Sequence, residues 1–257
     1  MTPFPAGNLN RVLQAFANGS LVGHAHGEGP VEVVWLHGWG RSGADFDASA
    51  ARLGHASLAL DLPGFGGSSP PDHAGGARLY ADLLRPVLAG LGRPVVLVGH
   101  SFGGRVATVL AATSPQLVSG LVLTGAPLIR RQTASRPPLV YRVARALHRR
   151  GLLGESAMEK YRQRFGSADY RAAHGVMRDV LVASVNESYE AELDKVTCPV
   201  RLVWGSNDRD VPVSVAEAAR EHLGNRATVQ VLNGVGHHVP LEAPDELGAA
   251  ALSLVVS

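Results

Sequence analysis

A serine between two glycines, directly after a run of apolar residues, is the sharpest chemical signal in the chain. Residues 99–103 read GHSFG, follow the apolar run 94–98 and precede a segment with helical periodicity. This G-x-S-x-G pattern between a strand and a helix is typical of a nucleophilic serine. The sharp turn strains the backbone at the serine and requires neighbours two residues away that lack a Cβ atom. The pattern predicts that Ser101 is a nucleophile at the carboxyl end of a strand, where open α/β sheets bind ligands.

A serine hydroxyl becomes a good nucleophile when a base takes its proton and a third group orients that base. Candidates for both follow later apolar runs of the chain. Asp208 comes after the run 200–204, and His237 comes after the run 228–232. The order serine, aspartate, histidine is the one that accompanies this strand–turn–helix pattern. We therefore expect Asp208 and His237 to complete a catalytic triad with Ser101.

Neighbouring residues compete for two of these roles. Asp210 competes with Asp208, although aspartates in such loops often cap the following helix. His238 competes with His237, which directly follows a glycine. We favour Asp208 as the acid and His237 as the base. His100 is expected to pack or to hydrogen-bond locally.

Attack on a carbonyl also needs hydrogen-bond donors for the charge that develops on its oxygen. Loss of one such donor typically slows catalysis by about 100- to 1,000-fold. The backbone N–H of Phe102, at the start of the predicted helix, is one candidate. The loop after the apolar run 31–36 reads HGWG at residues 37–40. We expect the backbone N–H of Trp39, in this loop, to be the second donor.

The same glycine-rich loop also matches a dinucleotide-binding pattern. Residues 38–43 read GWGRSG, and Asp61 ends the next predicted strand, where a ribose-binding acid would stand. A chain with 30 glycines meets this pattern easily by chance. A dinucleotide-binding oxidoreductase would also leave the serine, the later acid and the histidine without a role. It is therefore the less favoured alternative.

The elements that must position these residues alternate along the chain. Short runs rich in β-branched residues are each followed by turn residues and then by helical periodicity. Near-continuous apolar strands that alternate with helices predict an α/β fold with a mostly parallel, doubly wound sheet. The predicted strands are 31–36, 57–60, 94–98, 120–123, 200–204 and 228–232, and the predicted helices are 44–53, 77–91, 102–112, 213–223 and 244–255.

The alternation breaks between residues 128 and 197, where apolar residues recur at helical spacing without a strand pattern. We interpret 128–197 as a helical insertion into a core formed by 1–127 and 198–257. Residues 128–178 hold eleven arginines and one lysine against three acids, a local charge of +9 in a chain of net charge +2. If this basic segment covers the substrate pocket, its positive charge would attract an anionic or carrier-bound ester. A solvated helical face is the other interpretation, and the one we favour.

Length and composition exclude several classes of protein. The 257 residues, 46% of them apolar, suffice for a core without disulfide or metal support. The single cysteine, Cys198, excludes an intrachain disulfide and a cysteine-rich zinc site. His24 and His26 are expected in a loop, without a cluster of further metal ligands.

The first residues lack the pattern of a secretory signal, and no apolar run approaches the ~18 residues of a membrane span. We expect a cytoplasmic protein without cofactor, metal, nucleic-acid partner or membrane partner.

Together, the motifs resemble those of the α/β-hydrolase family over nearly the whole chain outside the insertion. They are HGWG at 37–40, DLPGFG at 61–66, GHSFGG at 99–104, WGSND at 204–208 and GH at 236–237. The resemblance implies the branch with a serine nucleophile, because the haloalkane dehalogenase and epoxide hydrolase branches carry an aspartate at the position of Ser101. It also implies that the insertion is a helical cap over the pocket.

Within this family we expect a carboxylic ester hydrolase that acts on a small-molecule ester through an acyl-enzyme. Carbon–carbon bond hydrolases of aromatic meta-cleavage products share the layout and are the alternative. They usually carry a tryptophan directly after the catalytic histidine, where this chain has His238. The segments at 37–40 and 61–66 are also similar to those of pimeloyl-carrier-protein methyl ester esterases, whereas the cap shows no clear match. A non-catalytic ligand-binding relative is a further, less favoured alternative.

Overall fold

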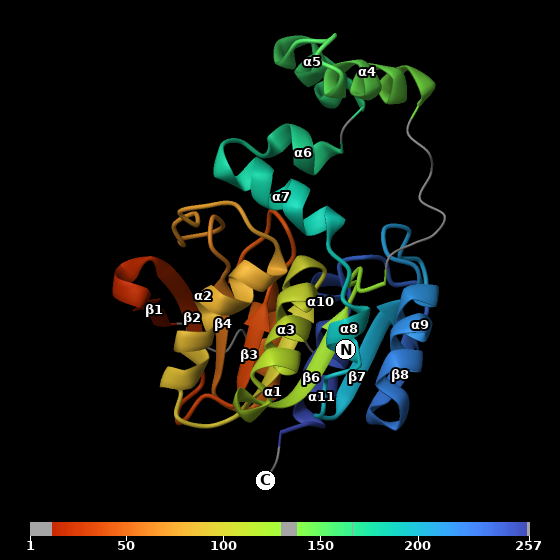
Figure 1. The fold of residues 1–257 in the computed structure, drawn as a ribbon. Coiled ribbons are helices and arrows are strands. Elements are labelled where there is room, and N and C mark those ends of the chain that lie inside the picture. Colours follow the sequence, from red (N-terminus) through yellow and green to blue (C-terminus); the bar gives the residue numbers. More distant parts are fainter. Residues whose placement is uncertain (1–11, 130–137, 166, 256–257) are drawn as a thin grey trace, which may run out of the picture.

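The computed structural model describes residues 12–129, 138–165 and 167–255. Eight strands of this part of the chain form one sheet, in the order β1-β2-β4-β3-β5-β6-β7-β8 (Figure 1). The strands are β1 (Val12–Phe16), β2 (Leu21–His26), β3 (Val33–Leu36), β4 (Ser57–Asp61), β5 (Val95–His100), β6 (Val118–Thr124), β7 (Val200–Gly205) and β8 (Ala227–Leu232). The six strands β3 to β8 run parallel, and β2 runs antiparallel to both β1 and β4. The predicted α/β fold with a mostly parallel sheet is confirmed.

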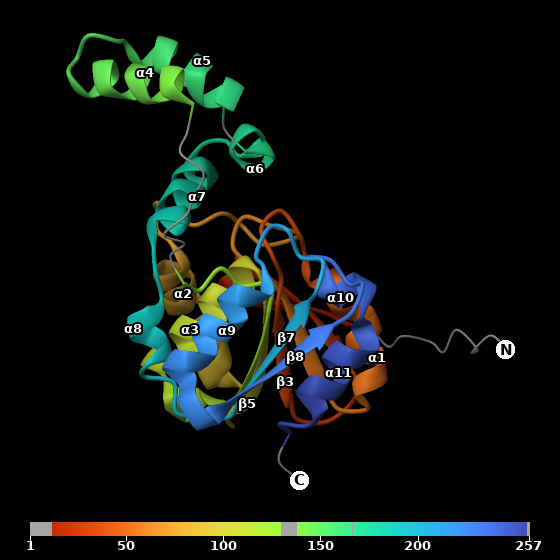
Figure 2. The ribbon, with the colours of Figure 1, turned by 90° about the vertical axis from the view of Figure 1, so that its right-hand side faces the viewer.

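Helices cover both faces of the sheet (Figure 2). On one face lie α2 (Ala77–Gly90), α3 (Phe102–Thr113), α8 (Glu190–Leu193) and α9 (Val213–Leu223). On the other lie α1 (Asp47–Leu53), α10 (Val239–Glu242) and α11 (Pro244–Leu252). Side chains of β3 alternate between the two cores: Val34 and Leu36 pack on the α2–α3 side, and Val33 and Trp35 on the α1–α11 side. Burial on both faces explains why the strands read as continuous apolar runs.

Short 3-10 helices join some of these elements. They are η1 (Ala17–Gly19), η2 (Gly43–Phe46), η3 (Pro115–Leu117) and η4 (Gly224–Arg226). The predicted helix 44–53 therefore begins as η2 and continues as α1, because the backbone changes geometry at Phe46.

The antiparallel hairpin β1–β2 is absent from the predicted strands. Its turn contains Asn18 and Gly19, which both adopt positive φ, as tight hairpin turns require. His24 and His26 were expected in a loop, and this expectation is wrong, since both lie on β2 and are buried. The Nε2 atom of His24 lies 3.5 Å from Asp61 Oδ2. Carboxylates of the neighbouring elements thus allow these polar rings inside the sheet.

Helices fill the described residues between β6 and β7, and no strand occurs among them. Four of these helices lead away from the sheet: α4 (Leu139–Arg149), α5 (Glu155–Phe165), α6 (Ala168–Ala172) and α7 (Val176–Asn186). In Figures 1 and 2, α6 and α7 lie next to the core, and α4 and α5 form a hairpin beyond them. The fifth helix, α8, packs on α3 and α9, and its Leu193 belongs to the main core.

Two partly buried polar side chains attach this helical segment to the core. Arg105, on α3, donates hydrogen bonds to the carbonyl oxygens of Pro127 (3.3 Å) and Ser184 (3.0 Å), where the chain leaves and rejoins the core. Glu187, just after α7, accepts a hydrogen bond from the backbone N–H of Ala77 at the start of α2 (2.8 Å). Since the first N–H groups of a helix have no partner within the helix, Glu187 caps α2 from a distant part of the chain.

None of the described helices combines the length and the apolar character that a membrane span requires.

Candidate active site

Ser101 lies on the sharp turn between β5 and α3, with φ +50° and ψ −110°. Its N–H donates a hydrogen bond to the carbonyl of Thr124, which ties the turn to the neighbouring strand (2.9 Å). A Cβ atom on Gly99 would lie 2.5 Å from Gly104 Cα, and one on Gly103 would lie 2.1 Å from Leu36 O. The close approach of backbone to backbone therefore explains the glycines of the motif.

Asp208 and His237 follow β7 and β8 and contact each other directly. His237 Nδ1–H donates a hydrogen bond to Asp208 Oδ2 over 2.8 Å. The other carboxylate oxygen of Asp208 accepts the backbone N–H groups of Asp210 (3.0 Å) and Val211 (2.8 Å). Both oxygens are thus engaged, and the residue is only 5% exposed. Asp210, the competing acid, is exposed and lines the cavity instead.

The pairing changes the acidity of both groups. Burial alone would raise the pKa of Asp208, but the hydrogen bonds from His237 and from backbone amides lower it overall. Burial alone would lower the pKa of His237, but the hydrogen bond and the negative charge of Asp208 raise it overall. The pair therefore favours a carboxylate that stabilises the charged imidazolium.

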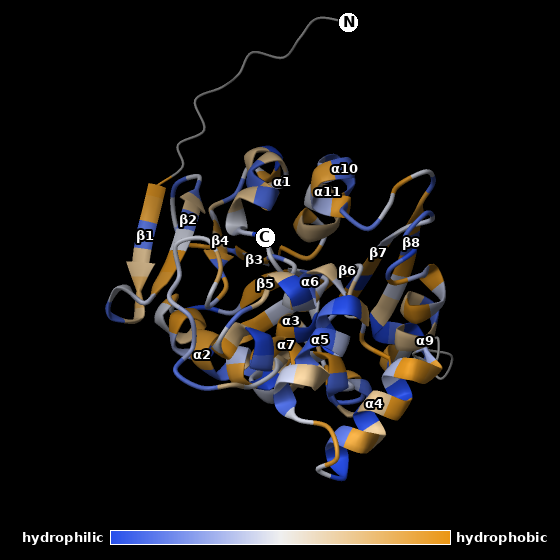
Figure 3. Cartoon of the chain, turned by 90° about the horizontal axis from the view of Figure 1, so that it is seen from above, coloured by the Kyte–Doolittle hydropathy of each residue, from blue (hydrophilic) through white to orange (hydrophobic). Residues whose placement is uncertain are grey.

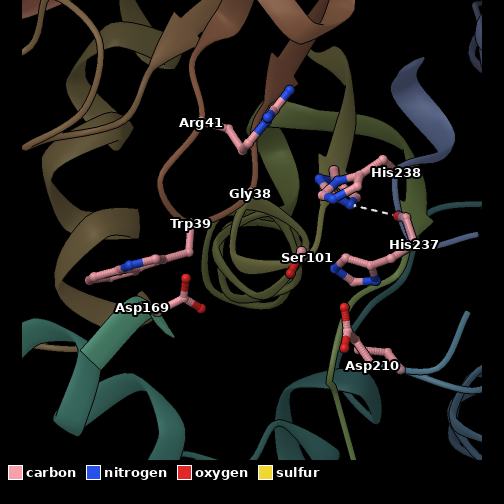
Figure 4. A pocket seen from close by; sticks show the side chains of 10 residues that line it. Gly38, Trp39, Arg41, Ser101, Asp169, Asp210, His237 and His238 are labelled. Atoms are coloured by element: carbon pink, nitrogen blue, oxygen red, sulfur yellow. Dashed lines mark hydrogen bonds between the residues drawn. The ribbon is translucent and has the colours of Figure 1, made fainter. Parts of the chain in front are cut away.

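A cavity of about 410 Å³ lies between these groups and the loop after β3. In Figure 4 the Ser101 hydroxyl lies at its centre beside the His237 ring, and Trp39 and Asp169 lie on the opposite side. Most of its lining residues are polar or charged: Gly38, Trp39, Arg41, His100, Ser101, Asp169, Asp210, Val211, His237 and His238. The cavity thus brings Ser101, His237 and Trp39 together, with Asp208 behind His237.

The loop after β3 is held by His37, which the sequence analysis did not single out. Its ring is fully buried, donates from Nδ1 to the carbonyl of Gly38 (2.7 Å) and accepts the N–H of Leu62 at Nε2 (2.9 Å). Burial lowers the pKa of His37, so the ring is neutral. The Gly38 carbonyl belongs to the same planar peptide as the Trp39 N–H, and His37 therefore fixes the direction of that N–H.

Aromatic contacts hold Trp39 and Phe102, the two residues whose backbone N–H groups are the candidate donors. The Trp39 ring meets the rings of Phe65 and Phe102 edge to face, with centroids 4.9 and 5.5 Å apart. The Phe102 N–H belongs to the first turn of α3, where backbone N–H groups lack partners within the helix.

His100 and His238 surround His237 without a bond to Asp208. His100 Nε2–H donates to the backbone carbonyl of His237 (2.9 Å; Figure 4). Burial lowers the pKa of His100 to about 3, so this ring is neutral. A local contact was expected, whereas its hydrogen bond joins the turn to the loop after β8. The exposed His238 ring packs on those of His100 and His237, with centroids 5.8 and 5.4 Å away.

The carboxylate of Asp61 is occupied by the protein itself. It accepts the backbone N–H groups of Gly43 (2.7 Å) and Gly67 (2.8 Å) and is buried. A dinucleotide-binding loop would instead offer the glycine N–H groups to a phosphate and the acid to a ribose. This arrangement favours a structural role for the G-x-G-x-x-G match.

One group of side chains in the described part of the chain has the spacing of a metal site. Ligand atoms of Asp208, Asp210 and His237 lie within 4.8 Å of one another. The Asp208 and His237 atoms are already bonded to each other and to backbone amides. The arrangement therefore fits proton transfer better than metal coordination.

Two further residues of the cavity were not found from the sequence. Asp169 comes from α6, far along the chain from any motif. Arg41 lies in the glycine-rich loop, and its guanidinium makes two hydrogen bonds to Asp45 (2.6 and 2.7 Å). The glycine pattern of the loop predicts a role for its backbone and gives no indication that the side chain of Arg41 lies at the cavity. No local pattern in the sequence marks Asp169.

Known proteins share both the sequence pattern and the fold. A 2-hydroxy-6-oxononadienedioate/2-hydroxy-6-oxononatrienedioate hydrolase of Cupriavidus pinatubonensis is 28% identical over an alignment of 246 residues. The match covers 82% of this chain and 82% of its own. A hydrolase of the same name from a Pseudomonas species is 24% identical and covers 95% of this chain and 94% of its own. A thermophilic esterase of Thermogutta terrifontis has a similar fold, with a TM-score of 0.67, 22% identity, and coverage of 96% of this chain and 99% of its own.

The model of the alpha/beta hydrolase family matches residues 33–250, which include every motif discussed above. The parallel sheet, the strained serine between β5 and α3 and the acid and histidine after β7 and β8 agree with that match. The chain belongs to the α/β hydrolase family, and it resembles hydrolases throughout.

Proposed function

We propose that the protein is a serine esterase that cleaves a carboxylic ester through an acyl-enzyme on Ser101. The hydrogen bond between His237 and Asp208, at a cavity that also holds the strained serine, carries the proposal. A histidine that is fixed through Nδ1 keeps Nε2 available as a base, which is the arrangement that serine hydrolysis requires.

In the first half of the reaction Ser101 Oγ attacks the acyl carbon of the ester. The hydroxyl proton passes to His237 Nε2, and the backbone N–H groups of Trp39 and Phe102 hold the negative oxygen of the tetrahedral intermediate. The bond from carbon to the alcohol oxygen then breaks. His237 returns the proton to the leaving alcohol, and an ester of Ser101 remains.

In the second half a water molecule attacks the acyl-enzyme. His237 takes a proton from the water, and the same two N–H groups hold the negative oxygen again. The bond to Ser101 Oγ breaks, the serine recovers its proton from His237, and the acid leaves. Asp208 orients the imidazole throughout and stabilises its charged form. No cofactor enters any step.

The substrate that fits this proposal is a small ester with polar groups. The cavity lies at the lower end of ligand-site volumes, and its lining is mostly polar. The basic helical segment makes an anionic or carrier-bound ester one candidate class, although a solvated surface is the favoured interpretation of its charge. If the charge attracts substrate, hydrolysis of an anionic ester slows as salt rises, whereas that of a neutral ester does not. An equal response of both esters would contradict such attraction. We keep the cytoplasm as the proposed location.

The test is hydrolysis of p-nitrophenyl esters from acetate to dodecanoate, followed by the absorbance of p-nitrophenolate. We expect turnover by the wild type and by the control Ser188→Ala, an exposed serine, and none above background by Ser101→Ala. A serine-directed phosphonate should add its mass at Ser101. Turnover that survives in Ser101→Ala would contradict the acyl-enzyme. Failure of the phosphonate to add would favour a non-catalytic ligand-binding relative.

The names of the relatives favour a second candidate, a hydrolase of carbon–carbon bonds. Two of the hydrolases to which the chain is similar over most of its length are named for 2-hydroxy-6-oxononadienedioate. His238 stands where such enzymes usually carry a tryptophan, which is why we place this candidate second. The discriminating assay offers that diacid and the ester series side by side. A kcat/KM for the diacid above that for every ester would replace our first proposal by the second.

A further inference from the structure

Helix α4 presents an apolar strip to the outside of the molecule. Four aliphatic side chains on or just after this helix are largely exposed, although aliphatic side chains are usually buried. They are Leu139 (71%), Val140 (48%), Val143 (49%) and, in the turn after the helix, Leu152 (72%). The first three lie within little more than one helical turn, so they share one side of α4. Contiguous exposed apolar residues mark interaction surfaces on soluble proteins.

Another side of α4 makes its contact with α5. Ala144 is buried there, and the Tyr141 ring meets Phe165 edge to face with centroids 6.1 Å apart. Positions 139, 140 and 143 do not belong to this packed side. The strip is therefore not covered by the partner helix.

Helix α4 and the residue that follows it carry four exposed arginines, Arg142, Arg145, Arg149 and Arg150. Within the described part of the chain, none of them forms an ion pair. In contrast, Arg162 of α5 forms an ion pair with Glu155, and Arg178 of α7 forms one with Glu159. Glu155 also lies 3.1 Å from His148 Nε2 on α4, but no acid of the described residues pairs with the four arginines.

The position of α4 leaves this surface accessible. In Figures 1 and 2 the α4–α5 hairpin is the part of the molecule farthest from the sheet, beyond α6 and α7. Figure 3 shows hydrophobic and hydrophilic residues in alternating bands along α4 at the edge of the molecule. The hairpin lies on the side of the sheet where Ser101 and the cavity lie, since Asp169 of α6 lines that cavity.

We propose that α4 binds an anionic lipid surface. A helix with an aliphatic strip and arginines beside it lies in the boundary between headgroups and acyl chains, with the apolar side inserted. Arginine side chains reach past the strip to the phosphates, and the negative potential of such a surface attracts them. We expected no membrane partner because the sequence lacks a spanning segment, but peripheral binding needs no such segment. The inference goes beyond the proposed ester hydrolysis and does not depend on it.

The first experiment is sedimentation with vesicles. Phosphatidylcholine vesicles are compared with vesicles that also contain phosphatidylserine, at low and at high salt. We expect the protein to sediment with the anionic vesicles, and binding to fall as salt rises because the charges are exposed. Ser101→Ala should bind as the wild type does, so a failed esterase assay and a failed binding assay are distinguishable.

Two variants test the two halves of the surface. Arg142→Glu/Arg149→Glu should weaken binding to the anionic vesicles by about tenfold or more, since each basic residue adds to the attraction. Val140→Ser/Val143→Ser should weaken it as well. The matched controls are Arg220→Glu on α9 and Leu252→Ser on α11, both exposed on the core. We expect wild-type binding from the controls and an unchanged circular dichroism spectrum from all four variants.

Several results would overturn the proposal. They are equal binding to neutral and anionic vesicles, no binding to either, and binding that both α4 variants retain. A dimer in sedimentation velocity that Val140→Ser/Val143→Ser dissociates, without vesicle binding, would assign the strip to a second copy of the chain. Capture of an acidic protein in place of vesicles would assign it to that protein.

Discussion

At the scale of single residues, the site depends on which nitrogen of each histidine carries the proton. His237 donates from Nδ1 to Asp208, His100 donates from Nε2 to the His237 carbonyl, and His37 donates from Nδ1 to Gly38. Each ring has one nitrogen committed to a fixed partner, which orients it. In the proposed reaction the second nitrogen of His237 exchanges the proton with Ser101.

The first prediction concerns the pH dependence of the reaction. In the proposed reaction neutral His237 is the base, so kcat/KM should rise with pH through its pKa, which lies above the ordinary value for histidine. Asp208→Asn removes the charge that raises this pKa. The acidic limb should therefore move to lower pH, and kcat should fall by about 1,000- to 10,000-fold. The measurement is a pH–rate profile of both proteins with a p-nitrophenyl ester, and a limb that does not move would contradict the role of Asp208.

The second prediction concerns His37. His37→Ala removes the hydrogen bond that directs the Gly38–Trp39 peptide, and a misdirected N–H stabilises the transition state less. We expect kcat to fall by roughly 10- to 100-fold, less than the loss of a complete donor, with KM nearly unchanged. Steady-state kinetics separates the two constants. A higher KM with an unchanged kcat would instead mean that His37 shapes substrate binding.

At the scale of elements, the turn between β5 and α3 is the most constrained part of the core. Strand, turn and helix were all predicted, because apolar runs and glycine spacing are local signals. The observed β5 extends to His100, two residues beyond the predicted end, since the parallel ladder to β6 continues up to the turn. The hairpin β1–β2 was missed although Asn18 and Gly19 provide a hairpin signal, because its strands lack the long apolar runs of the parallel ones.

The third prediction tests the sterics of this turn. Gly103→Ala places a Cβ atom against the backbone carbonyl of Leu36, which cannot move without disturbing β3. We expect the free energy of unfolding to fall by about 1–3 kcal/mol or more. Gly90→Ala is the matched control, because this exposed glycine of α2 has open space around it and alanine is the better helix former. Urea unfolding of both variants measures the difference, and equal stability would contradict the steric argument.

At the scale of the whole molecule, polar contacts join the helical segment between β6 and β7 to the core at both of its ends. Arg105 joins both of its ends, and Glu187 joins its return to α2. The segment adds Asp169 to the cavity, so its attachment affects the site.

The fourth prediction is that Arg105→Met loosens this attachment. The carbonyl of Pro127 loses the hydrogen bond from Arg105, and that of Ser184 keeps only the N–H of Glu187. A carbonyl that stays buried without a donor costs about 1–3 kcal/mol. Hydrogen exchange should then become faster in α7, while β5 and β6 keep their protection. Arg85→Met, which loses a bond to Ser114 within the core alone, is the control and should leave α7 unchanged. Unchanged exchange of α7 in Arg105→Met would show that other contacts hold the segment.

The sequence by itself determined the family and the parallel sheet and indicated Ser101, Asp208 and His237 as candidate site residues, because tight turns and buried strands impose residue types over short stretches. Tertiary structure decided the rest. It selected Asp208 over Asp210 as the partner of His237, since the turn after β7 points one carboxylate at the ring and the other into the cavity. It brought Asp169 to the cavity, used Glu187 to cap α2 and left the strip on α4 uncovered. Such contacts join residues far apart in the chain, and no local pattern of residue types records them.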